Sequence, residues 1–87
     1  MPKVKEKMAN ALSLPKEIAL DLPIVSAIGQ GEITIENYKS LLEFTDTKIR
    51  IRTKASTIII EGQSLTLQQI TSENLLITGQ IAGILFN

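Results

Sequence analysis

The feature that most constrains this chain is the alternation of polar and apolar residues from Ile24 onward. The alternating segments are Glu32–Ile35, Leu42–Phe44, Lys48–Arg52, Thr57–Glu61, Ser64–Leu67, Leu75–Thr78 and Ile84–Phe86. They recur about every eight residues with turn residues between them, a pattern typical of all-β domains. We therefore predict a single, mainly β domain over residues 24–87.

An internal repeat indicates how these strands are connected. Gly29-Gln30, Gly62-Gln63 and Gly79-Gln80 each separate two segments, and Thr45-Asp46 takes the equivalent place once. The pairs begin at 29, 45, 62 and 79, which is 16, 17 and 17 residues apart. Each unit then holds two strands, and a glycine in first position suits a type II′ hairpin turn. The repeat predicts an antiparallel β-meander built from 16-17-residue two-strand repeats, with a short β-solenoid as the alternative.

Turn positions also predict a register for the meander. The expected pairs are Phe44–Ile49, Leu42–Ile51, Ile51–Ile58, Ile49–Ile60, Ile60–Leu65, Ile58–Leu67, Leu67–Leu75 and Leu65–Ile77. Every inward residue then meets another inward residue, and a slip of one residue would destroy this agreement. Gly29-Gln30-Gly31 superficially resembles a phosphate-binding loop, but it joins two strands and is interpreted as a hairpin turn.

The segment before the strands has a different character. Residues 1–13 are predicted to form a short amphipathic helix, because Val4, Met8 and Leu12 fall on one face. Residues 14–23 form a connector with a proline near each end, part of which is predicted to be an edge strand. The helix is expected to cover the sheet, with contact to an anionic membrane surface as the alternative.

The predicted outer face of the sheet carries both charged and apolar residues. Lys48, Arg50, Arg52 and Lys54 are expected to form one basic row along a strand, partly neutralised by Glu43 opposite Arg50 and Glu61 opposite Lys48. The row could bind an anionic ligand or nucleic acid, although the net formal charge of zero gives no reason to expect nucleic acid. Four apolar residues are predicted to point outward as interaction candidates: Leu41, Ile59, Leu76 and Leu85. The N-terminal helix, a second subunit or a partner protein would cover them.

Composition argues against catalysis. The chain has neither histidine nor cysteine, so it lacks the usual general base near neutral pH and the commonest transition-metal ligands. The nine carboxylates fall mostly in turns or on the outer face, and none pairs as an acid and base. We therefore predict no enzyme activity, no metal and no cofactor. Without a run of 18 or more apolar residues, no transmembrane segment is predicted, and a cytoplasmic protein is expected.

Two stretches give the chain a family resemblance. Residues 14–23, followed by Ile28-Gly29-Gln30 and Ile33–Asn37, resemble the start of the YqfC branch of the YabP/YqfC family of sporulation proteins. Residues 42–46, 58–63 and 75–81 are similar to that family's repeated hydrophobic-glycine pattern. The resemblance spans roughly residues 12–86 and brings no catalytic residues with it.

The resemblance implies a protein of spore-forming Firmicutes that works in the mother cell, at or near the forespore membrane. Together with the uncovered apolar positions, it suggests a structural role in assembling the spore envelope through protein–protein interaction, with a YqfD-like membrane-associated sporulation protein as the partner. A homo-oligomer is also possible, because a second subunit could cover the outward apolar residues. Peripheral contact with a membrane is compatible with this role.

Overall fold

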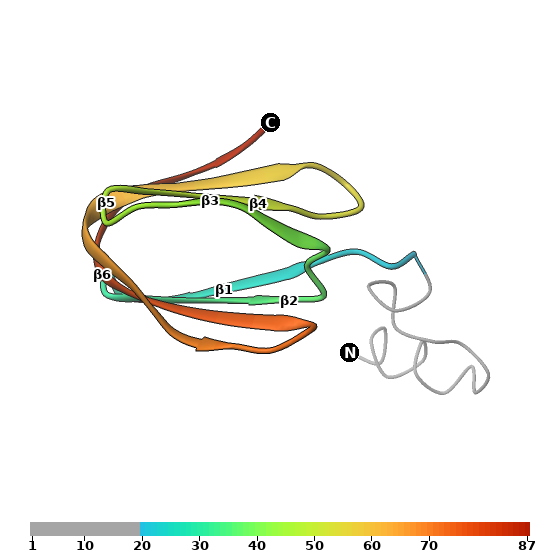
Figure 1. Cartoon of the computed structure of the whole chain (residues 1–87), viewed down its shortest axis with the longest axis horizontal. Coiled ribbons are helices and arrows are strands. Elements are labelled where there is room, and N and C mark those ends of the chain that lie inside the picture. The colour runs from blue at the N-terminus through green and yellow to red at the C-terminus, as the bar shows by residue number, and fades with distance from the viewer. Residues whose placement is uncertain (1–19) are drawn as a thin grey trace, which may run out of the picture.

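The computed structural model describes residues 20–87, which form six strands in one antiparallel sheet (Figure 1). The strands are β1 (Ile24–Ile28), β2 (Glu32–Glu36), β3 (Ser40–Phe44), β4 (Lys48–Arg52), β5 (Thr57–Ile70) and β6 (Asn74–Phe86). Their order in the sheet is β1-β2-β6-β5-β4-β3. The predicted helix and most of the connector lie outside the described residues. Residues 20–23 are not in a strand, and the edge strand β1 begins directly after them.

The first hairpin confirms the turn predicted at Gly29-Gln30. β1 and β2 pair from Ile24 opposite Glu36 to Ile28 opposite Glu32. Gly29 adopts a left-handed φ of 56° at the turn, which glycine tolerates at no steric cost. The turn joins two strands, as the sequence indicated.

In the second hairpin the predicted turn is observed, but the register of the two strands is shifted further along the ladder. Phe44 faces Ile49 across a tight turn, in which the Thr45 hydroxyl accepts hydrogen bonds from the backbone N–H groups of residues 47 and 48. A bulge then interrupts the ladder, so that Leu41, and not Leu42, lies opposite Ile51. The prediction was wrong at this pair because a bulge adds one residue to one strand and leaves its partner strand unchanged.

The ladder between β4 and β5 has the predicted register. Ile49 faces Ile60, and Ile51 faces Ile58. The connecting loop is fastened by Thr53, which is 5% exposed: its hydroxyl donates to the carbonyl of Ser56 at 2.7 Å and accepts from the N–H of Ser56 at 3.0 Å. The predicted antiparallel meander is therefore observed for β3, β4 and β5.

Gly62-Gln63 and Gly79-Gln80 are not turns, and here the predicted meander was wrong. β5 runs for 14 residues and β6 for 13, each straight through its Gly-Gln pair. Gly62 lies opposite Ile81, and Gln63 lies opposite Gln80. A Cβ on Gly62 would lie 2.1 Å from the carbonyl oxygen of Gln80, so glycine permits a close approach of the two backbones.

The predicted partners beyond Gly62 change accordingly. The expected pairs Ile60–Leu65, Ile58–Leu67, Leu65–Ile77 and Leu67–Leu75 are replaced by Ile60–Ile84, Ile58–Phe86, Leu67–Ile77 and Ile70–Leu75. β6 also pairs with β2, along Asn74–Thr78. Every described ladder is antiparallel, which is the pairing of hairpins.

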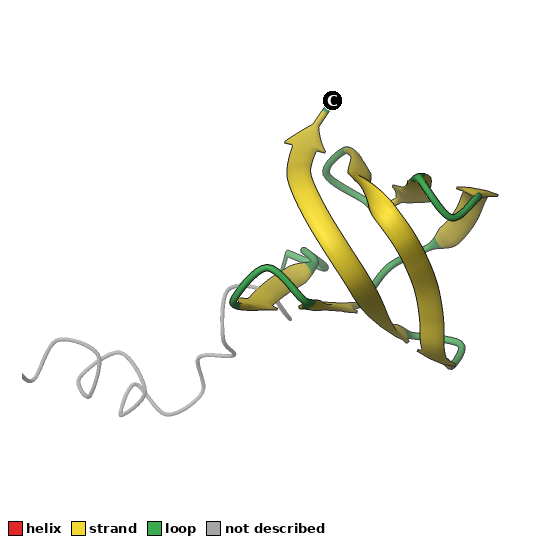
Figure 2. Cartoon of the chain, turned by 90° about the vertical axis from the view of Figure 1, so that its left-hand side faces the viewer, coloured by secondary structure: helices red, strands yellow, loops and turns green. Residues whose placement is uncertain are grey.

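The long strands bend the sheet back on itself into two layers (Figures 1 and 2). Layer 1 contains β3, β4, residues 57–61 of β5 and residues 83–86 of β6. Layer 2 contains β1, β2, residues 74–78 of β6 and residues 66–70 of β5. The layers join where β5 and β6 pass from one to the other, at the left of Figure 1. We call this junction the crossover.

The core lies between the two layers and consists of aliphatic side chains, as expected from a chain with so few aromatic residues. Seven isoleucines and two leucines are at most 2% exposed. Layer 2 contributes Ile33, Ile35, Leu75 and Ile77, layer 1 contributes Ile49, Ile51, Ile58 and Ile60, and Leu65 lies in β5 directly before layer 2. Complete burial of each such side chain contributes about 1.5–3 kcal/mol. Seven of these nine residues belong to the predicted inward pairs, and the other two, Ile33 and Ile35, lie in an alternating segment to which the predicted register did not extend.

The connection between β2 and β3 ties the layers together at the end opposite the crossover. Asn37 takes a left-handed φ of 66°, and its amide donates to Asp21 Oδ1 at 2.9 Å and to the carbonyl of Leu22 at 3.0 Å. Lys39 Nζ lies 2.7 Å from Asp21 Oδ2. The hydrogen bonds from Lys39 and then Asn37 lower the pKa of Asp21 below its usual value, so this corner is held by an ionised carboxylate at neutral pH.

Candidate interaction surfaces

The outer face of layer 1 carries the predicted basic row, and we call it the basic face. Lys48, Arg50 and Arg52 alternate along β4 with the buried Ile49 and Ile51, so all three point away from the core. Lys54 lies in the loop after β4 and is not part of the strand, which corrects the prediction of a four-residue row on one strand.

One of the two predicted ion pairs of the basic face, that of Glu43 with Arg50, is confirmed. Glu43 lies opposite Arg50, and its Oε1 is 3.4 Å from Arg50 Nη1. Glu61 lies opposite Lys48 in the ladder. An exposed ion pair of this kind contributes about 0.2–1 kcal/mol. The positive charge of Arg50 is therefore paired with a carboxylate of the same chain, whereas Arg52 lies opposite the uncharged Ser40 and Thr57.

The four predicted outward apolar residues do not form one strip. Ile59 and Leu85 are neighbours across the ladder on the basic face, and Leu85 is 49% exposed. Leu76 is on the outer face of layer 2, where it lies opposite Thr34. Leu41 packs against the core, because the bulge in β3 reverses its direction. Predicting Leu41 as an outward residue was wrong for that reason.

The outer face of layer 2 is acidic, and sequence reasoning did not identify it as a surface. Glu32, Thr34 and Glu36 alternate on β2 with the buried Ile33 and Ile35. The strand segments of layer 2 contain no lysine or arginine. We call this the acidic face. The alternation of Glu32 and Glu36 was visible in the sequence, but the assignment of β2 and β4 to different layers was not.

A shallow groove of about 270 Å³ runs along the acidic face. It is lined by residues of β2, β5, β6 and the turn before β6: Glu32, Thr34, Glu36, Gln69, Thr71, Asn74, Leu75 and Leu76. Leu76 is the half-buried aliphatic residue beside Thr34, the middle residue of the acidic row. The acidic face thus has an apolar centre between two carboxylates.

The two faces have the same layout because the two halves of the sheet are built alike, each with a short hairpin paired to one of the two long strands. β2 pairs with β6 in layer 2 as β4 pairs with β5 in layer 1. Each hairpin turn also bonds to a long strand at the crossover: Gly79 N–H donates to Gly31 O at 3.2 Å, and Gly62 N–H donates to Thr47 O at 3.1 Å. Consequently Leu76, which lies beside Thr34 in layer 2, occupies the position that Ile59, which lies beside Arg50, occupies in layer 1.

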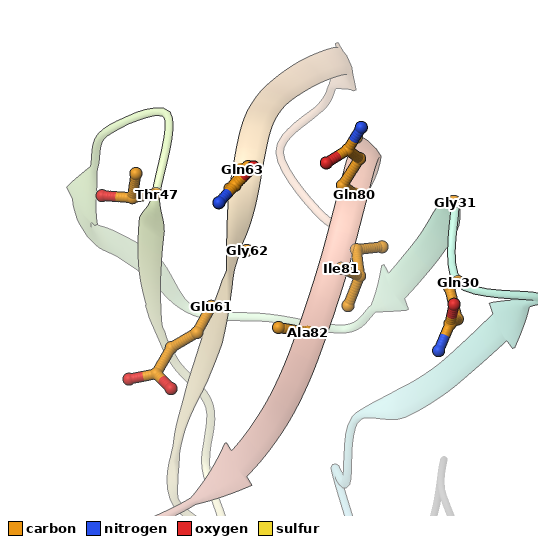
Figure 3. Close-up of a pocket in the computed structure, with 10 residues that line it drawn as sticks. Gln30, Gly31, Thr47, Glu61, Gly62, Gln63, Gln80, Ile81 and Ala82 are labelled. Carbon is orange, nitrogen blue, oxygen red and sulfur yellow. The ribbon is translucent and has the colours of Figure 1, made fainter.

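The crossover itself contains an open groove of about 780 Å³ (Figure 3). It is lined by residues of both hairpin turns and both long strands: Gln30, Gly31, Thr47, Glu61, Gly62, Gln63, Gly79, Gln80, Ile81 and Ala82. The glutamines of the three Gly-Gln pairs, which are far apart in the sequence, therefore line the same groove. Their carboxamides can donate and accept hydrogen bonds, and Glu61 is the one charged residue of the lining.

One edge of layer 1 is open and apolar. Along residues 83–86, β6 pairs with β5 on one side, and its ladder with β2 ends before this segment. Thr57 and Asn87 exchange both backbone hydrogen bonds. Because hydrogen-bonded and non-hydrogen-bonded pairs alternate, the backbone groups of Ile84 and Phe86 point away from β5. Phe86 is 65% exposed at this edge, which carries no charged side chain.

Metal binding, buried polar atoms and membrane-spanning helices can be assessed for the described residues. In residues 20–87, no group of three or more histidine, cysteine, aspartate or glutamate side chains is placed to hold a metal ion. Within the same range, each buried side-chain nitrogen or oxygen atom has a hydrogen-bond partner. The described part of the chain also has no helix of the length and apolarity that crossing a membrane requires.

Fold and surface together define a small, one-sheet β domain with two oppositely charged faces and an open apolar edge. Comparison with known proteins is consistent with the predicted resemblance: the sequence profile of the YabP family matches residues 24–87. The chain belongs to this family. It is 32% identical over 79 residues to the uncharacterized protein YqfC of Bacillus subtilis (strain 168), covering 91% of this chain and 85% of that protein. No solved structure matches the chain.

Proposed function

We propose that this protein is a non-catalytic sporulation protein that binds partners during assembly of the spore envelope. Membership of the YabP family supports the link to sporulation. The single observation that carries the binding role is the open apolar edge of layer 1, where Leu85 and Phe86 are exposed beside Ile59. An uncharged edge strand is a template on which another chain can add a strand.

The lining of the crossover groove supports a structural role over an enzymatic one. The crossover groove is lined mainly by glutamines and glycines, and Glu61 has no second titratable side chain in the lining to act as its acid or base partner. The proposed place of action is the mother cell, at or near the forespore membrane. The proposed partner is a YqfD-like membrane-associated sporulation protein.

Replacing Leu85 with glutamate should weaken capture of the YqfD-like partner by at least about tenfold, because a charge would enter the apolar edge. The measurement is a pull-down from sporulating cells with the full-length chain as bait, with the captured partner quantified. Leu85 is half-exposed, so the variant should fold, and its far-ultraviolet circular dichroism would check this.

Ile70→Glu is the matched control, since Ile70 is an exposed aliphatic residue (55%) at an edge of layer 2. It should capture the partner as well as the unchanged chain does. Equal capture by the unchanged chain and by Leu85→Glu would contradict a role for this edge. A chain that captures nothing would contradict the proposed function itself.

A second candidate function is favoured by the basic face, where three cationic side chains lie on one side of one strand. It is an anionic ligand or nucleic-acid-binding module using Lys48, Arg50, Arg52 and Lys54. Replacing Arg50 and Arg52 with glutamate should then abolish binding to single-stranded nucleic acid, and binding by the unchanged chain should fall steeply with salt. Filter binding at low ionic strength tests this, and absence of salt-sensitive binding would end the idea.

A further inference from the structure

We propose that copies of this protein stack through opposite faces, with the acidic face of one copy seated on the basic face of the next. The inference rests on the proposed assembly role and names a second copy of this chain as a partner. It comes from three observations: the opposite charge of the two faces, their shared layout and the incomplete neutralisation of both.

The charges of the two faces are complementary. The strand segments of layer 2 carry Glu32 and Glu36 and no cation. Those of layer 1 carry three cations, on β4, against two carboxylates, Glu43 and Glu61, which leaves an excess of one positive charge. Because each face lies on the outside of its own layer, the two point in opposite directions (Figure 1).

The spacing of the charges also matches. In each row the outer residues are four positions apart, about 13 Å along a strand. Two copies placed face to face with β2 running against β4 would set Glu32 opposite Arg52 and Glu36 opposite Lys48. The middle positions then meet without conflict, since Arg50 is already held by Glu43 at 3.4 Å and the middle residue of the acidic row is the uncharged Thr34.

The neighbouring strands match in the same arrangement. Leu76 lies beside the middle of the acidic row, and Ile59 lies beside the middle of the basic row. Stacking therefore brings these two half-buried aliphatic residues together between the charge pairs. Asn74, which lies opposite Glu36, would approach Glu61 and could donate a hydrogen bond to it. The apolar contact supplies burial, while the charges set the orientation.

An interface between two different faces of the same chain does not close on itself unless a rotation completes a ring. The expected product is therefore an open stack that grows with concentration, and a twofold dimer is not expected. Leu85 lies on the basic face beside Ile59 and borders this contact. The outward backbone groups of Ile84 and Phe86 lie at the edge of the sheet, so strand addition there is compatible with the stack.

Two charge reversals test the inference, using full-length chains and sedimentation velocity at low salt. Glu32→Lys with Glu36→Lys makes both faces basic, and Lys48→Glu with Arg52→Glu makes both acidic. Each variant alone should associate at least about tenfold more weakly than the unchanged chain, because its faces repel one another. An equimolar mixture of the two variants should associate again, in alternating order.

Salt provides an independent measurement. Association of the unchanged chain should weaken between about 0.01 M and about 1 M salt, as the Debye length shortens from about 30 Å to about 3 Å. Glu32→Gln with Glu36→Gln removes the two charges without reversing them, so it should weaken association less than the reversal does. This graded response would show that the loss in the reversed chain is caused by charge and not by misfolding. Thermal unfolding of each variant accompanies these measurements.

Three results would each overturn the inference. The unchanged chain could stay monomeric at low salt, or it could associate in a way that neither salt nor charge reversal affects. The third such result is a mixture of the two variants that stays monomeric while the unchanged chain associates. If the reversals fail in this way while Leu85→Glu still loses its partner, the proposed function stands and stacking alone is refuted. If stacking is confirmed and no other protein is captured, the chain assembles with itself and the YqfD-like partner is refuted.

Discussion

Replacing Gly62 with alanine should destabilise the protein by about 3 kcal/mol or more, the largest effect expected from so small a change. A Cβ at this position would lie 2.1 Å from the carbonyl oxygen of Gln80, 3.0 Å from its carbonyl carbon and 3.1 Å from the Cα of Ile81. All three atoms belong to the backbone of β6, so no side chain can rotate away to make room. Relief requires β5 and β6 to separate at the crossover, where both layers depend on them.

Urea denaturation followed by circular dichroism would measure this loss, and Gly83→Ala is the matched control. Gly83 is also in β6, but a Cβ there would meet nothing within 4 Å. Alanine restricts the unfolded chain more than glycine does, so the control should be unchanged or more stable by up to about 1 kcal/mol. Equal stability of Gly62→Ala and the unchanged chain would contradict the close approach of the two strands.

Replacing Ile60 with alanine should cost about 2–5 kcal/mol of unfolding free energy, because it leaves a cavity between the two layers. Ile60 is completely buried, and its ladder partners are Ile49 and Ile84. Native domains have a total stability of roughly 5–15 kcal/mol, so the variant should lose a large share of it and unfold at a clearly lower temperature. Thermal unfolding by circular dichroism measures the change.

Ile59→Ala controls for the general loss of an isoleucine from β5. Ile59 lies next to Ile60 but points to the basic face, where it is half-buried. Its replacement should cost about 1 kcal/mol, mainly through the lower strand propensity of alanine. Similar losses at positions 59 and 60 would contradict the assignment of inward and outward faces in this strand.

Local patterns were sufficient to predict the strands and the inward residues. The period of two is a property of the strand itself, so Ile33, Ile35, Ile49 and Ile51 could be assigned to the core without knowing the topology. Register was also predictable wherever a short turn determined it, as at the pair of Phe44 and Ile49. These features depend on residues that are close together in the sequence.

The errors arose where distant parts of the chain decide the outcome. A glycine followed by glutamine has the same local signature in a hairpin turn and in the middle of a bent strand. At Gly29 the chain turns, whereas at Gly62 it continues, because a second long strand lies alongside it at the crossover. The bulge that turns Leu41 inward is likewise invisible in the alternation, since Leu41 and Leu42 are both apolar.

The candidate surfaces were predictable in part. The basic row on β4 and its partners Glu43 and Glu61 followed from local register. The acidic face required knowledge that β2 and β4 lie in different layers, which depends on the pairing of β2 with β6. That ladder joins segments about forty residues apart, and no turn between them indicates it.

Because β5 and β6 each belong to both layers, neither layer can melt while the other stays intact. Loss of layer 2 would take residues 66–70 and 74–78 with it and leave the remainder of the same two strands without half of their core contacts. The domain should therefore behave as one cooperative unit, with similar amide exchange protection on both sides of the crossover. Folding of the domain also depends on contacts between segments that are distant in the sequence. We therefore expect this chain to fold slowly and in an all-or-none manner.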